Sequence, residues 1–142
     1  MPPLIGYAAA GHGVNAGGLA LFLILFVWQF PHFDAIAWMY RDDYARGGIR
    51  MLPVVEPDGE STVRRILLCS FLLIPISLAP AFLGMTGALY TTAAIAAGLG
   101  VLCVGARLGR ERTLPRARAL LLATVLYLPA LLCVMVLDRR VL

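Results

Sequence analysis

Three long stretches of the chain contain no Asp, Glu, Lys or Arg and consist mainly of apolar residues. They cover residues 1–33, 66–106 and 119–137. A helix that crosses the hydrocarbon core of a bilayer needs about 20 apolar residues, each adding about 1.5 Å of rise. Each stretch is long enough for one such helix, and the middle stretch is long enough for two. The pattern therefore predicts an all-α, polytopic transmembrane helix bundle with four spans.

Turn signals divide these stretches into individual helices. The four spans are expected at Val14–Phe33, Ile66–Leu83, Ala88–Ala106 and Ala119–Leu137. Glycines within residues 11–18 predict a loop before the first span, and residues 4–10 are expected to be a short helical stub. The helical pattern can continue over residues 34–40. The third span is rich in Ala and Gly, which allow helices to approach closely in lipid.

The overall composition agrees with a membrane protein. Of 142 residues, 61% are hydrophobic and 14% are charged. An average soluble domain has about 25% charged residues. This chain has too few polar side chains to cover a water-exposed globule, which excludes a soluble domain.

The basic residues are all arginines, and they cluster between the predicted spans. Five lie in residues 41–65, five in residues 107–118, and the remaining two are Arg139 and Arg140. Two spans separate the two arginine-rich segments, so both segments are expected on the same side of the membrane. The positive-inside rule makes that side cytoplasmic. Because the arginines flank spans, membrane topology explains the net charge of +4 better than nucleic-acid binding does, and no nucleic-acid partner is expected.

A first group of polar residues lies at the cytoplasmic end of the first span. It contains Gln29, Pro31, His32 and Asp34. Gln29 and His32 are three residues apart and are expected on one face of a helix. Polar groups at membrane depth usually face a bundle interior or a cavity. An interfacial cap, in which these groups simply meet lipid headgroups, is an equally good interpretation.

A second group follows within three helical turns. It consists of Arg41, Asp42, Asp43, Tyr44, Arg46 and Arg50. Carboxylates can hold Mg²⁺, which bridges phosphate oxygens, and guanidinium groups can bind the remaining oxygens. The alternative is a solvated loop whose charges pair with one another. Neither group alone identifies a function.

The segment WQFPHFDAIAWMYRDDYARGGIRMLPVV, residues 28–55, resembles the protohaem IX farnesyltransferase (haem O synthase) family. This family belongs to the wider UbiA group of intramembrane prenyltransferases. The shared features are a WQxPHF helix end and a DYxRxGIxMLPV loop, in this order and at the family's spacing. Residues 2–10 and 117–138 are also similar to the family. The resemblance implies that residues 1–142 are the C-terminal part of a single UbiA-type domain.

The resemblance also implies a reaction and its participants. The family transfers a farnesyl group from farnesyl diphosphate to a vinyl group of haem B, adds a hydroxyl group from water, and releases haem O and diphosphate. The implied cofactor is Mg²⁺, and haem B is a substrate. Other implied partners are membrane lipid and, downstream, a haem A synthase that serves a terminal oxidase. The implied location is the bacterial cytoplasmic (inner) membrane.

Residue roles carry over from the matching positions. Asp43, with Asp42 as a second ligand, would bind Mg²⁺ and diphosphate. Arg41 and Arg46 would bind phosphate oxygens, and Tyr44 would hydrogen-bond the same group or shape the pocket. Among the substrate-binding positions, Arg50 belongs to this diphosphate loop. Gln29 and His32 would lie on the haem side of the cavity, with His32 contacting the iron or a propionate.

The chain departs from the family in two ways. Asp34 stands where the family usually has a large apolar residue, and its carboxylate is expected either at the exposed interface or as an addition to the site. The Asn/Asp-rich loop that UbiA enzymes carry in their amino-terminal half is also missing. The chain begins like the middle of a membrane protein, and it is expected to be inactive alone. It would be a fragment, a partner of a separate first half, or a remnant.

Two further functions stay open at this point. One is a UbiA-type prenyltransferase with another aromatic or tetrapyrrole acceptor. The other is a non-catalytic membrane protein, such as an assembly partner, in which the arginines serve only topology.

Overall fold

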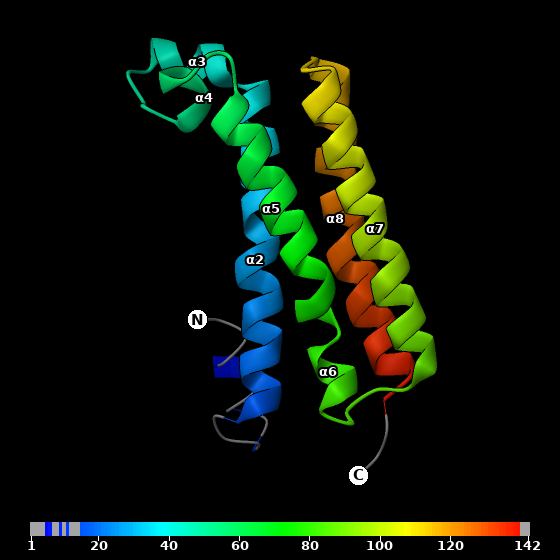
Figure 1. Ribbon diagram of the computed structural model, residues 1–142. Helices are drawn as coiled ribbons and strands as arrows, with labels where there is room; N and C mark the ends of the chain where they lie inside the picture. Colours follow the sequence, from blue (N-terminus) through cyan, green and yellow to red (C-terminus); the bar gives the residue numbers. More distant parts are fainter. Residues whose placement is uncertain (1–4, 7–8, 10, 12–14, 140–142) are drawn as a thin grey trace.

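The computed structural model describes residues 15–139 together with Ile5, Gly6, Ala9 and Gly11. The helices are α2 (Ala16–Met39), α3 (Arg41–Arg46), α4 (Leu52–Val55), α5 (Glu60–Ser77), α6 (Ala79–Phe82), α7 (Ala88–Arg110) and α8 (Leu114–Leu137). The part of the chain that the structure describes has no strand beyond one isolated bridge between Thr86 and Arg139. This confirms the predicted all-α fold (Figure 1).

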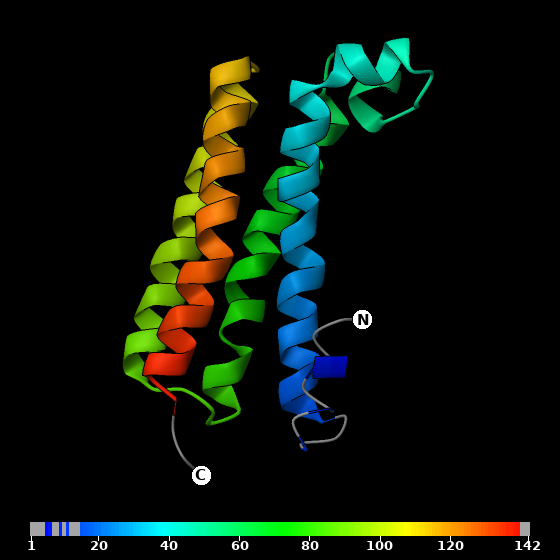
Figure 2. The same ribbon diagram turned by 180° about the vertical axis from the view of Figure 1, so that it is seen from behind.

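Four segments are long and apolar enough to cross a membrane: α2, α5 with α6, α7, and α8. The protein is thus a multi-pass integral membrane protein, as predicted. Helix α2 packs against α5 and α8, and α7 packs against the same two helices, so the four helices form a closed ring. Short helices α3 and α4 lie at one end of the bundle, and α6 lies at the other (Figures 1 and 2).

The helices extend further into the arginine-rich segments than predicted. Helix α5 begins at Glu60, α7 continues to Arg110, and α8 begins at Leu114, so only residues 111–113 separate α7 from α8. Arginine is a good helix former, and its long side chain can reach water from a helix end. Charge therefore marked where the apolar spans end but did not mark where the helices end. Both arginine-rich segments lie at the same end of the bundle, as predicted (Figure 1).

The glycine-rich loop prediction was wrong for its last residues. Gly17 and Gly18 are buried in the first turn of α2, and their amide groups donate to the side-chain oxygen of Asn15 at 2.9 and 3.1 Å. An N-terminal Asn cap explains why the helix begins here despite two glycines. Ile5 and Gly6, from the predicted stub, are helical. Residues 4, 7, 8 and 10 of that prediction lie outside the described residues.

Small residues bring α5 and α7 close together, as the composition of the third span predicts. A Cβ atom added at Gly98 would lie 2.7 Å from Cγ1 of Ile74, and one added at Gly105 would lie 3.1 Å from Cγ2 of Ile66. Both distances are shorter than ordinary van der Waals contact. These two glycines are therefore required for the observed packing distance.

Buried polar contacts join the helices at the end opposite α3 and α4. The Tyr127 hydroxyl lies 2.5 Å from the Ser77 hydroxyl, and the Tyr90 hydroxyl donates to the Ser77 carbonyl oxygen at 2.8 Å. Asp138, just after α8, accepts the amide N–H of Tyr90 through Oδ2 at 2.8 Å. Gly87 at the start of α7 has no capping side chain, so Asp138 caps α7 from the end of its neighbour.

Candidate functional site

The predicted diphosphate-binding residues lie on and beside α3, which follows α2 after Tyr40 alone. Their charges pair locally. Arg46 forms an ion pair with Asp43 one turn earlier, and Nε of Arg41 lies 3.8 Å from Oδ1 of Asp42. Asp42, Asp43 and Arg46 are exposed. Exposed pairs of this kind contribute about 0–1 kcal/mol, so each charged group can exchange its partner for a ligand at small cost.

A cleft of about 280 Å³ lies between α3 and α4. Its lining residues are Arg41, Asp42, Ala45, Pro53, Val54 and Pro57. The structure thus places two predicted residues in one cleft. Asp43 and Arg46 lie outside its lining, Tyr44 is half-buried, and Arg50 is exposed in the connection to α4.

The carboxylates suit a metal ion that is held partly by its substrate. In the described part of the chain, no group of three or more His, Cys, Asp or Glu side chains is arranged to hold a metal. Mg²⁺ commonly uses only one or two carboxylates together with phosphate oxygens and water. Asp42 and Asp43 are adjacent, exposed carboxylates on α3, and of the two only Asp42 lines the cleft.

The base of α3 is fixed by Trp38, a buried residue near the end of α2. The Arg41 guanidinium carbon lies 4.8 Å from the centre of the Trp38 ring, within the range of a cation–π contact. Gly59 packs on the same ring with φ of 72°, and an added Cβ would lie 2.1 Å from Cζ3 of Trp38. Arg112 donates a hydrogen bond to the Asp58 carbonyl oxygen. Trp38 and Arg112 therefore hold the turn at residues 57–59 from two sides.

His32 contacts α8 from its position two turns before the end of α2. Its Nδ1 lies 3.0 Å from the Thr124 hydroxyl oxygen. The ring stacks on Trp28 with centroids 4.7 Å apart and an interplanar angle of 19°. The Trp28 indole N–H donates to the Thr124 carbonyl oxygen at 2.8 Å. The seven residues from His32 to Met39 correspond to about 10 Å of helix rise, which separates this cluster from α3.

Gln29 does not take part in this arrangement. It is half-buried, and His32 is paired with Trp28, four residues earlier, instead of with Gln29. Both i,i+3 and i,i+4 spacings bring side chains together on a helix. In this helix the contact that forms is the i,i+4 stacking of His32 on Trp28.

Asp34 does not lie at an exposed interface, so the first of the two expectations for it was wrong. It is buried, with a side-chain exposure of 3%. The Arg65 Nε donates to its Oδ2 at 2.8 Å, and a second guanidinium nitrogen donates to Oδ1. This bidentate pair joins α2 to α5. The charge that replaces an apolar residue is thus neutralised by an arginine that the sequence assigned to topology.

The residues that sequence reasoning missed are the partners of the predicted ones. Trp28 had a detectable signal, because it lies four residues before His32. Thr124 and Arg65 had none, since they lie 92 and 31 residues from their partners. Contacts between separate spans cannot be derived from local spacing.

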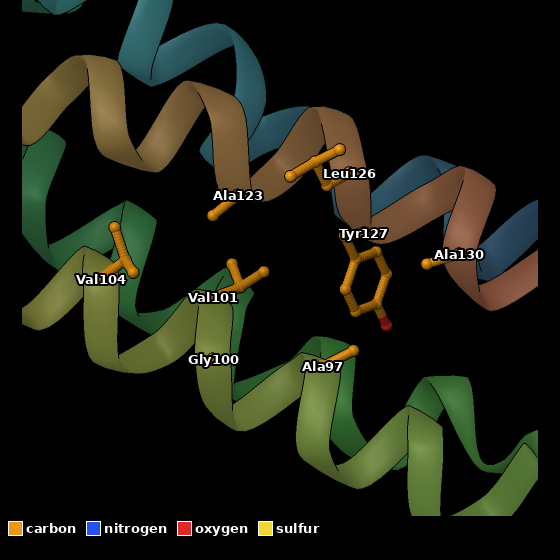
Figure 3. Close-up of a pocket in the computed structure, with 8 residues that line it drawn as sticks. All are labelled: Ala97, Gly100, Val101, Val104, Ala123, Leu126, Tyr127 and Ala130. Atoms are coloured by element: carbon orange, nitrogen blue, oxygen red, sulfur yellow. The ribbon is translucent and has the colours of Figure 1, made fainter.

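A second cavity lies between α7 and α8 and has an apolar lining. It has a volume of about 290 Å³, and its residues are Ala97, Gly100, Val101, Val104, Ala123, Leu126, Tyr127 and Ala130 (Figure 3). Its one hydroxyl group belongs to Tyr127 and is bonded to Ser77. It provides no group for acid–base or phosphate chemistry.

Comparison with known proteins supports the resemblance found in the sequence. The model of the UbiA prenyltransferase family matches residues 1–128. Over 98% of its own length, this chain is 56% identical to the protoheme IX farnesyltransferase of Solibacter usitatus. It is 48% identical to the protein of the same name from Koribacter versatilis over 99% of its length, and 44% identical to that from Salinibacter ruber over 97%.

The same matches cover only about half of each relative. The chain spans 48% of the Solibacter usitatus and Koribacter versatilis proteins and 49% of the Salinibacter ruber protein. It matches the C-terminal part of these relatives, about half of their length. No solved structure gives a significant match to the chain.

Proposed function

Because the chain belongs to the UbiA prenyltransferase family, we propose that it forms the C-terminal part of an enzyme that farnesylates haem B. The substrates are farnesyl diphosphate, haem B and water, and the products are haem O and diphosphate. The observation that carries the proposal is the exposed acid–arginine cluster on α3, joined directly to the span that bears His32. High identity to relatives named protoheme IX farnesyltransferase supports the choice of acceptor.

The α3 cluster is suited to bind the diphosphate. Asp43 and Asp42 would hold Mg²⁺ together with diphosphate oxygens, and the bound ion supplies positive charge to the leaving group. Arg46 would leave its ion pair with Asp43 and bind a phosphate oxygen. Arg41 would do the same while its guanidinium stays over Trp38, 4.8 Å from the ring centre. Tyr44 and Arg50 would complete the polar wall.

Bond formation would take place deeper in the membrane, where water is scarce. The allylic carbon–oxygen bond breaks as diphosphate leaves, and a vinyl carbon of haem B forms the new carbon–carbon bond. Water then adds to the carbocation left on the neighbouring carbon and loses a proton, which leaves a hydroxyl group there. Gln29 and His32 lie on the part of α2 that would face the haem. Arginines concentrated at the α3 end would place that end in the bacterial cytoplasm.

The chain alone is proposed to be inactive, because it supplies only part of the polar groups around the diphosphate. The test joins the N-terminal half of the Solibacter usitatus relative to this chain. Membranes that contain the fusion are given haem B and farnesyl diphosphate, and the extracted haem is analysed by mass spectrometry. We expect haem O from the fusion and none from the chain alone.

Asp43→Asn should lower haem O formation by the fusion by about a hundredfold or more, because electrostatic stabilisation of the leaving group is lost. Asp58→Asn is the matched control, since Asp58 is also exposed at the same end but lies outside the α3 cluster. Equal activity of the two variants would refute the role of Asp43. A farnesylated product other than haem O would refute the proposed acceptor.

A further inference from the structure

The hydroxyl group of Thr124 in α8 lies within hydrogen-bond distance of His32. The Thr124 hydroxyl oxygen lies 3.0 Å from Nδ1 of His32 and 2.8 Å from the carbonyl oxygen of Leu121. The Leu121 carbonyl oxygen can only accept, and when the single hydroxyl hydrogen is donated to it, the Thr124 oxygen is left to accept from Nδ1. In this arrangement the neutral imidazole is protonated at Nδ1 and unprotonated at Nε2.

The orientation of the ring is fixed by the same two helices. Trp28 stacks on the imidazole at an interplanar angle of 19°, which sets the plane of the ring. The Trp28 indole N–H also donates to the Thr124 carbonyl oxygen at 2.8 Å. Thr124 thus contacts α2 through both its hydroxyl group and its backbone carbonyl oxygen. His32 has little freedom to turn away from it.

The second ring nitrogen is available for a ligand. Within the residues that the structure describes, no side chain or backbone group bonds to Nε2 of His32, and the residue is only half-buried. Histidines that ligate a metal almost always donate their other ring N–H to a fixed acceptor, which sets the tautomer and the ring orientation. The Thr124 hydroxyl is an acceptor of this kind.

We infer that Thr124 is a positioning residue that holds His32 in the Nδ1-protonated form and presents its Nε2 to the iron of haem B. The assignment of haem as the ligand rests on the function proposed above, whereas the tautomer does not. Trp28 supports the same geometry. Thr124 itself touches no substrate and acts only through His32.

The tautomer can be measured on this chain without any substrate. The chain contains two histidines, so His12→Asn leaves His32 as the single source of imidazole signals. With ¹⁵N-labelled histidine in lipid nanodiscs, at a pH about two units above the ordinary imidazole pKa of about 6.5, we expect a proton on Nδ1. Thr124→Val should shift the population toward the Nε2-protonated form. Thr124→Ser should retain the original form, because it keeps the hydroxyl.

The effect on haem is measured by titrating ferric protohaem into the same nanodiscs and following the Soret band. Thr124→Val should weaken binding by about ten- to a hundredfold, the usual effect of losing such a partner, and Thr124→Ser should bind nearly as the unchanged chain does. Thr91→Val is the matched control. The Thr91 hydroxyl also donates to a carbonyl of its own helix, that of Gly87 at 2.9 Å, but it has no histidine partner.

Three results would overturn the inference. They are a proton on Nε2 in the unchanged chain, an unchanged tautomer and haem affinity in Thr124→Val, and no His32-dependent haem spectrum. Product formation by the fusion enzyme is a separate measurement. A fusion that farnesylates another acceptor would refute the proposed function and leave the Nδ1-protonated form of His32 in place.

Discussion

The two ends of the bundle use polar residues in opposite ways. At the α3 end, Arg46 pairs with Asp43 three residues away and Arg41 with the adjacent Asp42, and three of these four side chains are exposed. At the other end, Tyr127 and Tyr90 bond to Ser77 across 50 and 13 residues, and all three are buried. Short-range exposed pairs leave charges available to a ligand. Long-range buried bonds fix helices relative to one another.

Asp34 and Arg65 are the exception at the α3 end, because they form a long-range pair with one buried partner. Arg65→Leu should therefore have the largest effect on stability. It leaves a buried carboxylate without its cation, and we expect a loss of about 3 kcal/mol in the free energy of unfolding in detergent or bicelles. Arg64→Leu is the control, since Arg64 is exposed beside it.

The double variant Asp34→Leu with Arg65→Leu should recover most of that stability, because an apolar pair needs no compensating charge. Similar losses from Arg64→Leu and Arg65→Leu would show that only the removal of positive charge matters. The Asp34–Arg65 pair would then not hold α2 to α5.

The turn that supports α3 gives the next largest effect. Gly59 and Gly48 have φ values of 72° and 69°, but only Gly59 has a neighbour within contact distance of an added Cβ. Alanine at either position should cost about 1–2 kcal/mol for the left-handed backbone. Gly59→Ala should cost about 1 kcal/mol more, because it must displace Trp38. Thermal unfolding of the two variants measures the difference, and equal losses would contradict the Trp38 contact.

The smallest effect is expected at the opposite end. Tyr127→Phe removes the hydroxyl that bonds to Ser77, and hydrogen bonds between membrane helices contribute about 1 kcal/mol. Tyr40→Phe, at an exposed tyrosine, should leave the free energy of unfolding unchanged. A loss in Tyr127→Phe that is no larger than that in Tyr40→Phe would remove the contrast between the two ends.

The sequence predicts the spans well because hydrophobicity over about 20 residues is a property of each segment alone. It also places the α3 charges correctly at one end of the bundle, since they follow α2 directly. It misplaces Asp34, whose partner Arg65 is 31 residues away. It also misses Thr124, a single hydroxyl in an apolar span. These roles depend on which helices are neighbours, and hydropathy carries no information about that.

The cap that Asp138 provides to α7 has a consequence for synthesis. The ribosome adds Asp138 48 residues after Tyr90, whose amide group it will bind. The first-turn amide groups of α7 therefore lack this acceptor until α8 has been synthesised. The cap can form only when the end of α8 lies beside the start of α7. Helices α7 and α8 therefore form a hairpin whose two ends are joined by this cap. The start of α7 gains this stabilising contact only after α8 has been made.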